Sequence, residues 1–128
     1  MKHVLIDTNF LLVPGQFGVD IFSEIDRIMI GPYELCVVDK TLAELRKIVD
    51  TASGKDKAAA SLALRLVEAK KLHHLKTEKN LNTDELIVEL AKQPDFVVAT
   101  QDMALKRILK QNSVPLIVLR QKKYLKLM

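Results

Sequence analysis

Four acidic residues at separated points of the chain are the groups best suited to chemistry. Asp7 directly follows an apolar run, Asp102 lies two residues after another, and Glu44 and Asp84 fall in the first turns of expected helices. Carboxylates gathered at one place raise one another's pKa and oppose folding, unless a divalent cation lies between them. Such oxygen ligands suit Mg²⁺ or Mn²⁺, which support phosphodiester cleavage by activating water and stabilising the departing oxygen.

Three of these acids also have a purely structural interpretation. Glu44 follows Thr41 by three residues, which is the spacing of a capping box. Asp84 is placed to favour a helix N-terminus through the helix dipole, and Asp102 to cap the helix that follows it. Each signal is weak by itself, so the prediction of a site depends on all four carboxylates meeting.

The elements that must position these acids alternate between strand and helix. Apolar runs predict strands over residues 4–6, 35–38, 96–100 and 115–119, with a short candidate at 74–76. Helical spacing of apolar residues predicts helices over 20–29, 41–49, 55–71, 82–91 and 103–111, and Pro14, Gly15 and Gly18 predict a loop. This alternation predicts an α/β fold whose parallel sheet is covered on both faces. Ligands of such sheets bind beyond the carboxyl ends of the strands, near the point where strand order reverses.

The composition fits one globular domain over residues 1–128. Apolar residues make up 48% and charged residues 28%, and the net charge is +4, which is compatible with a polyanionic partner. Cys36 is the only cysteine, which excludes an internal disulfide and a zinc site built from cysteines. No run of about 18 apolar residues occurs, so we expect no membrane span and a cytoplasmic protein. Residues 120–128 are expected to form a basic C-terminal tail.

Four segments resemble, in order, the motifs of the PIN-domain nucleases: residues 6–12, 42–45, 83–87, and 98–102 with 105–107. The resemblance implies a three-layer sandwich with a central parallel sheet of about five strands. It also implies an endoribonuclease that depends on Mg²⁺ or Mn²⁺ and hydrolyses single-stranded RNA. The catalytic and metal-ligating positions of the family fall on Asp7, Glu44, Asp84 and Asp102, and the supporting positions on Thr8, Asn9 and Thr100.

The branch of the family is indicated by two further segments. Residues 11–18 and 105–115 look more like the PIN nucleases of ribosomal RNA processing than the toxin branch. Two positions depart from the family pattern: Gln101 stands where the family often has Asn, and Glu85 where the ribosomal branch often has a second Asp. Neither is a main ligand position.

Basic residues next to the acids are candidates for holding RNA phosphates, with the solvated faces of amphipathic helices as the alternative interpretation. They are Lys40, Arg46 and Lys47 around Glu44, and Lys106 and Arg107 after Asp102. The alanine-rich helix at 55–71 is expected to pack internally, with a homodimer as the alternative. A ribosomal partner and an antitoxin partner are both compatible with the resemblance.

Histidine does not enter the predicted mechanism, because His3, His73 and His74 show no metal-ligand spacing along the chain. Two other functions are alternatives to a ribonuclease of ribosomal or toxin type. A non-catalytic RNA-binding or ribosome-assembly module would keep the fold and the basic faces. A receiver-like phosphoacceptor is disfavoured, because no adjacent acid pair precedes Asp7.

Overall fold

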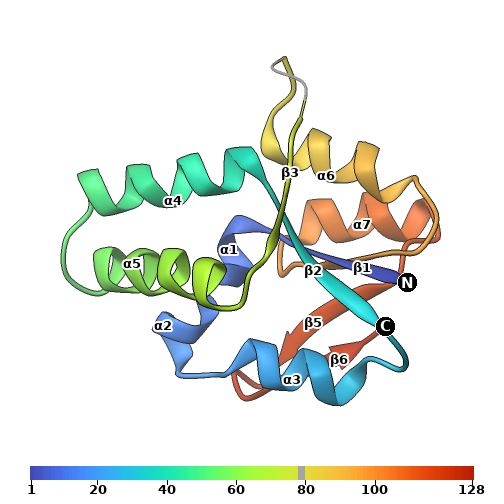
Figure 1. Cartoon of the computed structure of the whole chain (residues 1–128), viewed down its shortest axis with the longest axis horizontal. Coiled ribbons are helices and arrows are strands. Elements are labelled where there is room, and N and C mark those ends of the chain that lie inside the picture. Colours follow the sequence, from blue (N-terminus) through green and yellow to red (C-terminus); the bar gives the residue numbers. More distant parts are fainter. Residues whose placement is uncertain (78–79) are drawn as a thin grey trace.

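A six-stranded sheet organises the described part of the chain, which in this computed structural model comprises residues 1–77 and 80–128. Its strands are β1 (Lys2–Ile6), β2 (Tyr33–Val38), β3 (His73–Leu75), β4 (Phe96–Ala99), β5 (Leu116–Arg120) and β6 (Tyr124–Leu127). The strand order is β3-β2-β1-β4-β5-β6, and every pair is parallel except β5 with β6 (Figure 1). The predicted parallel α/β sheet is confirmed, with an antiparallel strand added at one edge.

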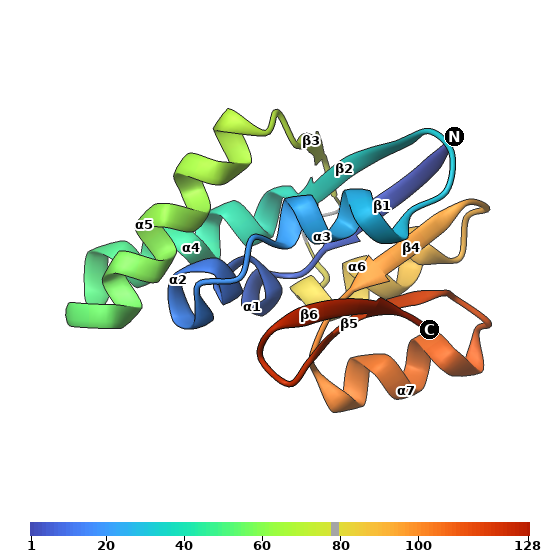
Figure 2. The same ribbon diagram turned by 90° about the horizontal axis from the view of Figure 1, so that it is seen from below.

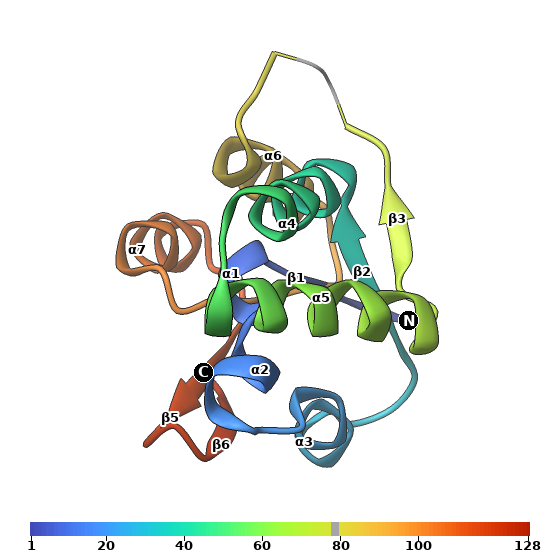
Figure 3. The ribbon, with the colours of Figure 1, turned by 90° about the vertical axis from the view of Figure 1, so that its left-hand side faces the viewer.

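Helices cover both faces of the sheet, as the sequence predicts. They are α1 (Thr8–Leu11), α2 (Val13–Phe17), α3 (Ile21–Ile28), α4 (Asp39–Thr51), α5 (Gly54–Ala69), α6 (Thr83–Ala91) and α7 (Met103–Gln111). Side chains from α1 to α5 share one buried cluster with one face of the strands, and side chains from α6 and α7 share another with the opposite face. Figure 3 shows α6 and α7 on one side of the sheet and α3 on the other. The molecule therefore has three layers.

The segment after β1 is helical up to Phe17, so the predicted loop is wrong at Pro14 and Gly15 and begins only at Gly18. Pro14 lies in the first turn of α2, where a missing backbone N–H costs no helical hydrogen bond. Gly18 ends that helix with φ of 68°, a left-handed conformation that glycine adopts readily. A Cβ on Gly15 would lie 2.5 Å from Cα of Ala59, so this glycine lets α2 approach α5 closely.

The alanines of the helix predicted at 55–71 are used inside the domain. Ala59, Ala60 and Ala63 of α5 are buried in the same cluster as residues of α2 and α4. In α7, Leu105 and Leu109 are buried, whereas Ala104 and Ile108 are exposed. No helix of the described residues is long and apolar enough to span a membrane.

The predicted basic tail at residues 120–128 is wrong, because β5 extends to Arg120 and residues 124–127 form β6. Leu125 is 1% exposed in the core, whereas the other three residues of β6 are exposed. The backbone N–H of Leu125 donates to Glu24 at 2.9 Å, and its carbonyl accepts from Arg27 at 3.0 Å. Figure 2 shows β6 between β5 and α3, which carries both side chains. The alternation of exposed and buried side chains along β6 is that of a strand. In the sequence this alternation is hard to recognise, because the segment is rich in lysines.

Truncating Leu125 tests whether β6 belongs to the folded core. We expect Leu125→Ala to lower the free energy of unfolding by about 2–5 kcal/mol, because it removes a buried side chain and leaves a cavity. Lys126→Ala, at the neighbouring exposed position, is the matched control and should change stability by less than about 0.5 kcal/mol. Urea denaturation followed by circular dichroism measures both. Equal effects of the two variants would contradict the role assigned to β6.

Candidate active site

The candidate site lies where the order of the strands reverses, between the carboxyl ends of β1 and β4. Asp7 directly follows β1, and Asp102 follows β4 after two residues. A cleft of about 440 Å³ opens there. It is called the acidic cleft below, and its lining residues are Asp7, Thr8, Asn9, Glu44, Lys47, Ile48, Thr83, Asp84 and Asp102. The structure thus brings all four predicted acids together.

Asp7 is held at the base of the cleft by two hydrogen bonds. One carboxylate oxygen accepts from the backbone N–H of Phe10 at 2.8 Å and caps α1, and the other accepts from the hydroxyl of Thr100. Both Asp7 and Thr100 are buried. Burial and, to a smaller extent, the charges of Asp84 and Asp102 outweigh the lowering effect of the two hydrogen bonds and raise the pKa of Asp7 to about 6. The predicted support of Asp7 by Thr100 is present.

Asp102 combines the structural and the functional interpretation. Its Oδ1 accepts from the backbone N–H of Leu105 at 2.7 Å, so Asp102 caps α7 as the sequence predicts. Its own backbone N–H donates to the hydroxyl oxygen of Thr100 at 3.1 Å. Thr100 therefore connects the carboxylate of Asp7, after β1, with the backbone of Asp102, after β4.

Glu44 is not part of a capping box with Thr41, because α4 begins at Asp39 and Glu44 lies in its second turn. Instead, Oε1 of Glu44 accepts from the hydroxyl of Thr8 at 2.6 Å and from the hydroxyl of Thr83 at 3.0 Å. The hydroxyl oxygens of Thr8 and Thr41 lie 3.1 Å apart. These threonines aim Glu44 into the cleft. Sequence reasoning missed the role of Thr83, although it directly precedes Asp84.

Asp84 is the second residue of α6, whose N-terminus is capped by Asn82. The pKa of Asp84 is raised by partial burial, then by the charges of Asp102 and Glu44. Together with the effects on Asp7, this links all four carboxylates electrostatically. Within residues 1–77 and 80–128, no three of them place ligand atoms within 4.8 Å of one another. Such spacing leaves room for the waters that Mg²⁺ usually keeps.

The remaining predicted residues divide into two groups. Lys47 and Asn9 line the acidic cleft, and Lys40 lines an adjoining cleft with Glu44 and Asp84. Within the described part of the chain, Asn9 forms no hydrogen bond to a carboxylate. Of its predicted support for the acids, only its position in the cleft is seen. Three of the predicted basic residues, Arg46 of α4 and Lys106 and Arg107 of α7, do not line the acidic cleft.

The two departures from the family pattern have structural roles. The amide of Gln101 donates to the carbonyl of Leu119 at 3.3 Å and accepts from its backbone N–H at 2.7 Å, which ties the end of β4 to β5. Glu85 completes a capping box with Asn82 at the start of α6. Neither side chain lines the acidic cleft.

Comparison with known proteins identifies the family to which this fold and cleft belong. The pattern of the family described as "PIN like domain" matches residues 4–122. This chain belongs to the PIN-like domain family. The resemblance found in the sequence motifs is thereby confirmed. The solved structure of the PIN domain endonuclease Utp24 superposes on this PIN domain with a TM-score of 0.81 at 26% identity, covering 98% of this chain and 90% of that one.

Relatives of this PIN domain include proteins named as ribonucleases. Ribonuclease VapC4 of Methanocaldococcus jannaschii is 33% identical over 128 residues, which is 97% of this chain and 95% of the relative. The rRNA-processing protein fcf1 of Schizosaccharomyces pombe is 30% identical over 118 residues, which is 90% of this chain and 57% of that protein. The family is therefore one of ribonucleases, and its named members here do not distinguish the ribosomal branch from others.

Removing the charge of Asp7 tests the electrostatic crowding of the cleft. The pKa of Asp7 in the folded chain, about 6, exceeds the ordinary value of 3.8, so ionising this carboxyl costs stability as pH rises from about 4 to 6. We expect metal-free Asp7→Asn to be more stable than wild type by up to about 3 kcal/mol at pH 7, with a much smaller gain at pH 4. Urea denaturation in EDTA at both pH values measures this.

Asp20→Asn is the control for this experiment. Hydrogen bonds from the backbone N–H and the hydroxyl of Ser23 lower the pKa of Asp20, so its ionised form stabilises the fold. That contribution is present at neutral pH and is lost as pH falls through the lowered pKa. Asp20→Asn should therefore gain no stability at pH 7. A gain for Asp7→Asn that is the same at pH 4 and pH 7 would contradict the crowding.

Proposed function

We propose that this PIN domain is an endoribonuclease that hydrolyses phosphodiester bonds in single-stranded RNA with Mg²⁺ or Mn²⁺. The observation that supports this most directly is the convergence of Asp7, Glu44, Asp84 and Asp102 on one cleft. The names of the relatives as ribonucleases support the nuclease class. The proposal covers the four carboxylates as catalytic and metal-ligating residues, and the cytoplasm as the place of action.

The donor set of the cleft fits a hard divalent cation. Its acidic ligands are all oxygens, and the raised pKa of Asp7 and of Asp84 reflects burial and mutual repulsion that a cation would relieve. We propose that Asp7 and Asp102 are the central ligands, that Asp84 holds the ion or a water, and that Glu44 completes the cleft. When bound, the ion supplies activation of water and neutralisation of charge on the scissile phosphate.

The protein's own groups orient these ligands. Thr100 holds the carboxylate of Asp7, and Thr8 and Thr83 hold that of Glu44. The caps on α1 and α7 take one oxygen each from Asp7 and Asp102, which restricts rotation of both carboxylates. Such fixed ligands keep their geometry when an RNA phosphate enters, and this is what preorganisation requires.

RNA is the proposed substrate because the cleft combines acids with nearby cations. Lys47 lines the acidic cleft, and Lys40 the adjoining one. Lysine ammonium groups bind backbone phosphates without reading the base sequence. Arg46, Lys106 and Arg107 extend this proposed RNA surface along α4 and α7. The biological role we propose is ribosomal RNA processing, in line with the name of the rRNA-processing protein fcf1, and a toxin-type ribonuclease is the alternative.

Cleavage of an unstructured RNA tests the proposed activity. We expect wild type to cleave it with Mn²⁺ and to lose activity in EDTA, and Asp7→Asn to lose more than about 100-fold, beyond the 10–100-fold typical of residues that only support a metal ligand. Asp50→Asn is the control and should cleave like wild type, because Asp50 is an exposed carboxylate on α4, the helix that carries Glu44. Gel analysis of end-labelled RNA measures the rates. RNA binding without cleavage by wild type would favour the non-catalytic RNA-binding module instead.

Lys47 provides a separate test of RNA contact. We expect Lys47→Ala to weaken RNA binding at low salt and to reduce the slope of log K against log salt concentration by about 1, because one phosphate contact is lost. Lys55→Ala changes an exposed lysine in the first turn of α5, outside the acidic cleft, and should leave the slope unchanged. Fluorescence anisotropy with a labelled single-stranded RNA in EDTA measures both. An equal change in slope for the two variants would remove the specific role of Lys47.

A further inference from the structure

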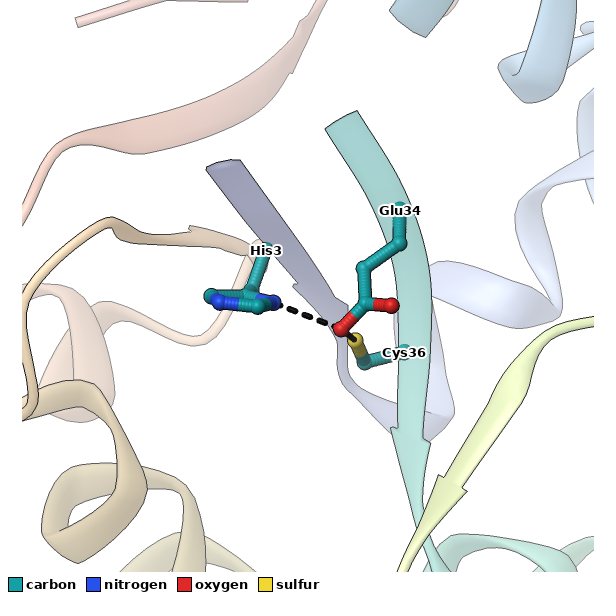
Figure 4. A group of neighbouring side chains, drawn as sticks. All are labelled: His3, Glu34 and Cys36. Carbon is teal, nitrogen blue, oxygen red and sulfur yellow. Dashed lines mark hydrogen bonds and ion pairs between the residues drawn. The ribbon is translucent and has the colours of Figure 1, made fainter. Parts of the chain in front are cut away.

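Three potential metal ligands meet at the opposite end of the strands from the acidic cleft. His3 of β1 and Glu34 of β2 are register partners in the parallel pairing, and Cys36 lies two residues further along β2, on the same face as Glu34 (Figure 4). His3 precedes Asp7 by four residues, which corresponds to about 13 Å along a strand. This cluster, called the His3 cluster below, is therefore separate from the acidic cleft.

The ligand atoms of the His3 cluster are close enough for one ion. Nδ1 of His3 lies 2.6 Å from Oε1 of Glu34, and Sγ of Cys36 lies 3.5 Å from the same oxygen. All three ligand atoms lie within 4.8 Å of one another, and this is the one such group among residues 1–77 and 80–128. Ligands of a tetrahedral Zn²⁺ lie roughly 3.3–3.8 Å apart, given bonds of 2.0–2.3 Å. Small side-chain movements would therefore admit the ion.

Access to the His3 cluster is from the side of Glu34. The side chains of His3 and Glu34 are 30% and 32% exposed, whereas Cys36 is buried. Glu34 also lines an open cleft of about 930 Å³ together with His73, the register partner of Cys36. His73 is near enough to interact electrostatically with Glu34, but among the described residues it is not one of the three whose ligand atoms lie within 4.8 Å of one another. The cluster thus combines a buried sulfur with a route from solvent.

Without an ion, the cluster has an ordinary hydrogen-bonded arrangement. His3 bonds to Glu34, and the Cys36 thiol, whose pKa is raised to about 12 mainly by burial, donates to the same carboxylate. A partly exposed His–Glu pair alone contributes little to stability, about 1 kcal/mol or less. A purely structural role therefore contributes little to stability, and it does not call for a nitrogen, an oxygen and a sulfur around one point.

We propose that His3, Glu34 and Cys36 form a binding site for Zn²⁺ that is distinct from the acidic cleft. On binding, the S–H bond of Cys36 breaks, the proton passes to solvent, and a sulfur electron pair forms the bond to the ion. The mixed nitrogen, oxygen and sulfur donors favour Zn²⁺ over Mg²⁺, which prefers six oxygen ligands. The two sites of the molecule are therefore selective for ions of different softness.

Co²⁺ serves as a coloured probe for this site in the full chain. We expect one equivalent of Co²⁺ to give a near-ultraviolet thiolate-to-metal charge-transfer band that excess Mg²⁺ does not remove and Zn²⁺ does. Cys36→Ser should abolish the band, and His3→Gln should weaken Co²⁺ binding at least about tenfold. Asp7→Asn and His74→Gln, which leave the three ligands intact, should keep the band.

Two outcomes would overturn the proposal. One is the absence of a thiolate band in wild type that is folded by circular dichroism and fully reduced. The other is a band in His3→Gln with the same Co²⁺ affinity as wild type, which would show that Cys36 binds the ion without the cluster. Because His3 is partly exposed, this variant is expected to fold even if Cys36→Ser does not. Neither outcome depends on ribonuclease activity, so the test is independent of the proposed function.

Discussion

Mutual repulsion of four carboxylates at one edge of a parallel sheet is the constraint to which the structure responds. The carboxyl ends of β1 and β4 bring Asp7 and Asp102 together, and the second turn of α4 and the first turn of α6 add Glu44 and Asp84. Asp7 and Asp102 cap α1 and α7, where the positive end of a helix dipole and backbone N–H groups stabilise negative charge. The same hydrogen bonds that begin two helices therefore make the crowding tolerable, and folding and site assembly use the same atoms.

Much of the fold could be predicted from local pattern. The limits of α7 at Met103 and Gln111 are those the sequence predicts, since Asp102 is a strong cap and apolar spacing is regular. The loop was predicted to start too early, at Pro14, because proline and glycine mark the beginning and end of a helix as readily as a loop. The C-terminal strand was missed because a single buried residue, Leu125, alternates with exposed ones. Its strand character depends on β5 and α3, which are distant in sequence.

The sequence predicted which residues form the site better than it predicted the contacts that hold them there. Strand ends and family motifs were sufficient to predict that one cleft holds Asp7, Glu44, Asp84 and Asp102. The reason is that the carboxyl ends of parallel strands lie at the same edge of the sheet. The interpretation of Glu44 as part of a capping box was wrong. Its hydrogen-bond partners Thr8 and Thr83 come from other segments rather than from the start of its own helix. Hydrogen bonds between side chains far apart in sequence have no local signal, and pairing across strands likewise hid the approach of His3 to Cys36.

The contacts of α3 with the outermost strand have a consequence for behaviour at high concentration. An unprotected sheet margin offers its amides and carbonyls to any other chain and so invites intermolecular strand addition. Here the side chains of Glu24 and Arg27 occupy the outward amide and carbonyl of Leu125, and Lys126 adds charge beside them. The molecule thus carries its own protection against self-association at this margin, supplied by one helical turn and separate from the acidic cleft between β1 and β4.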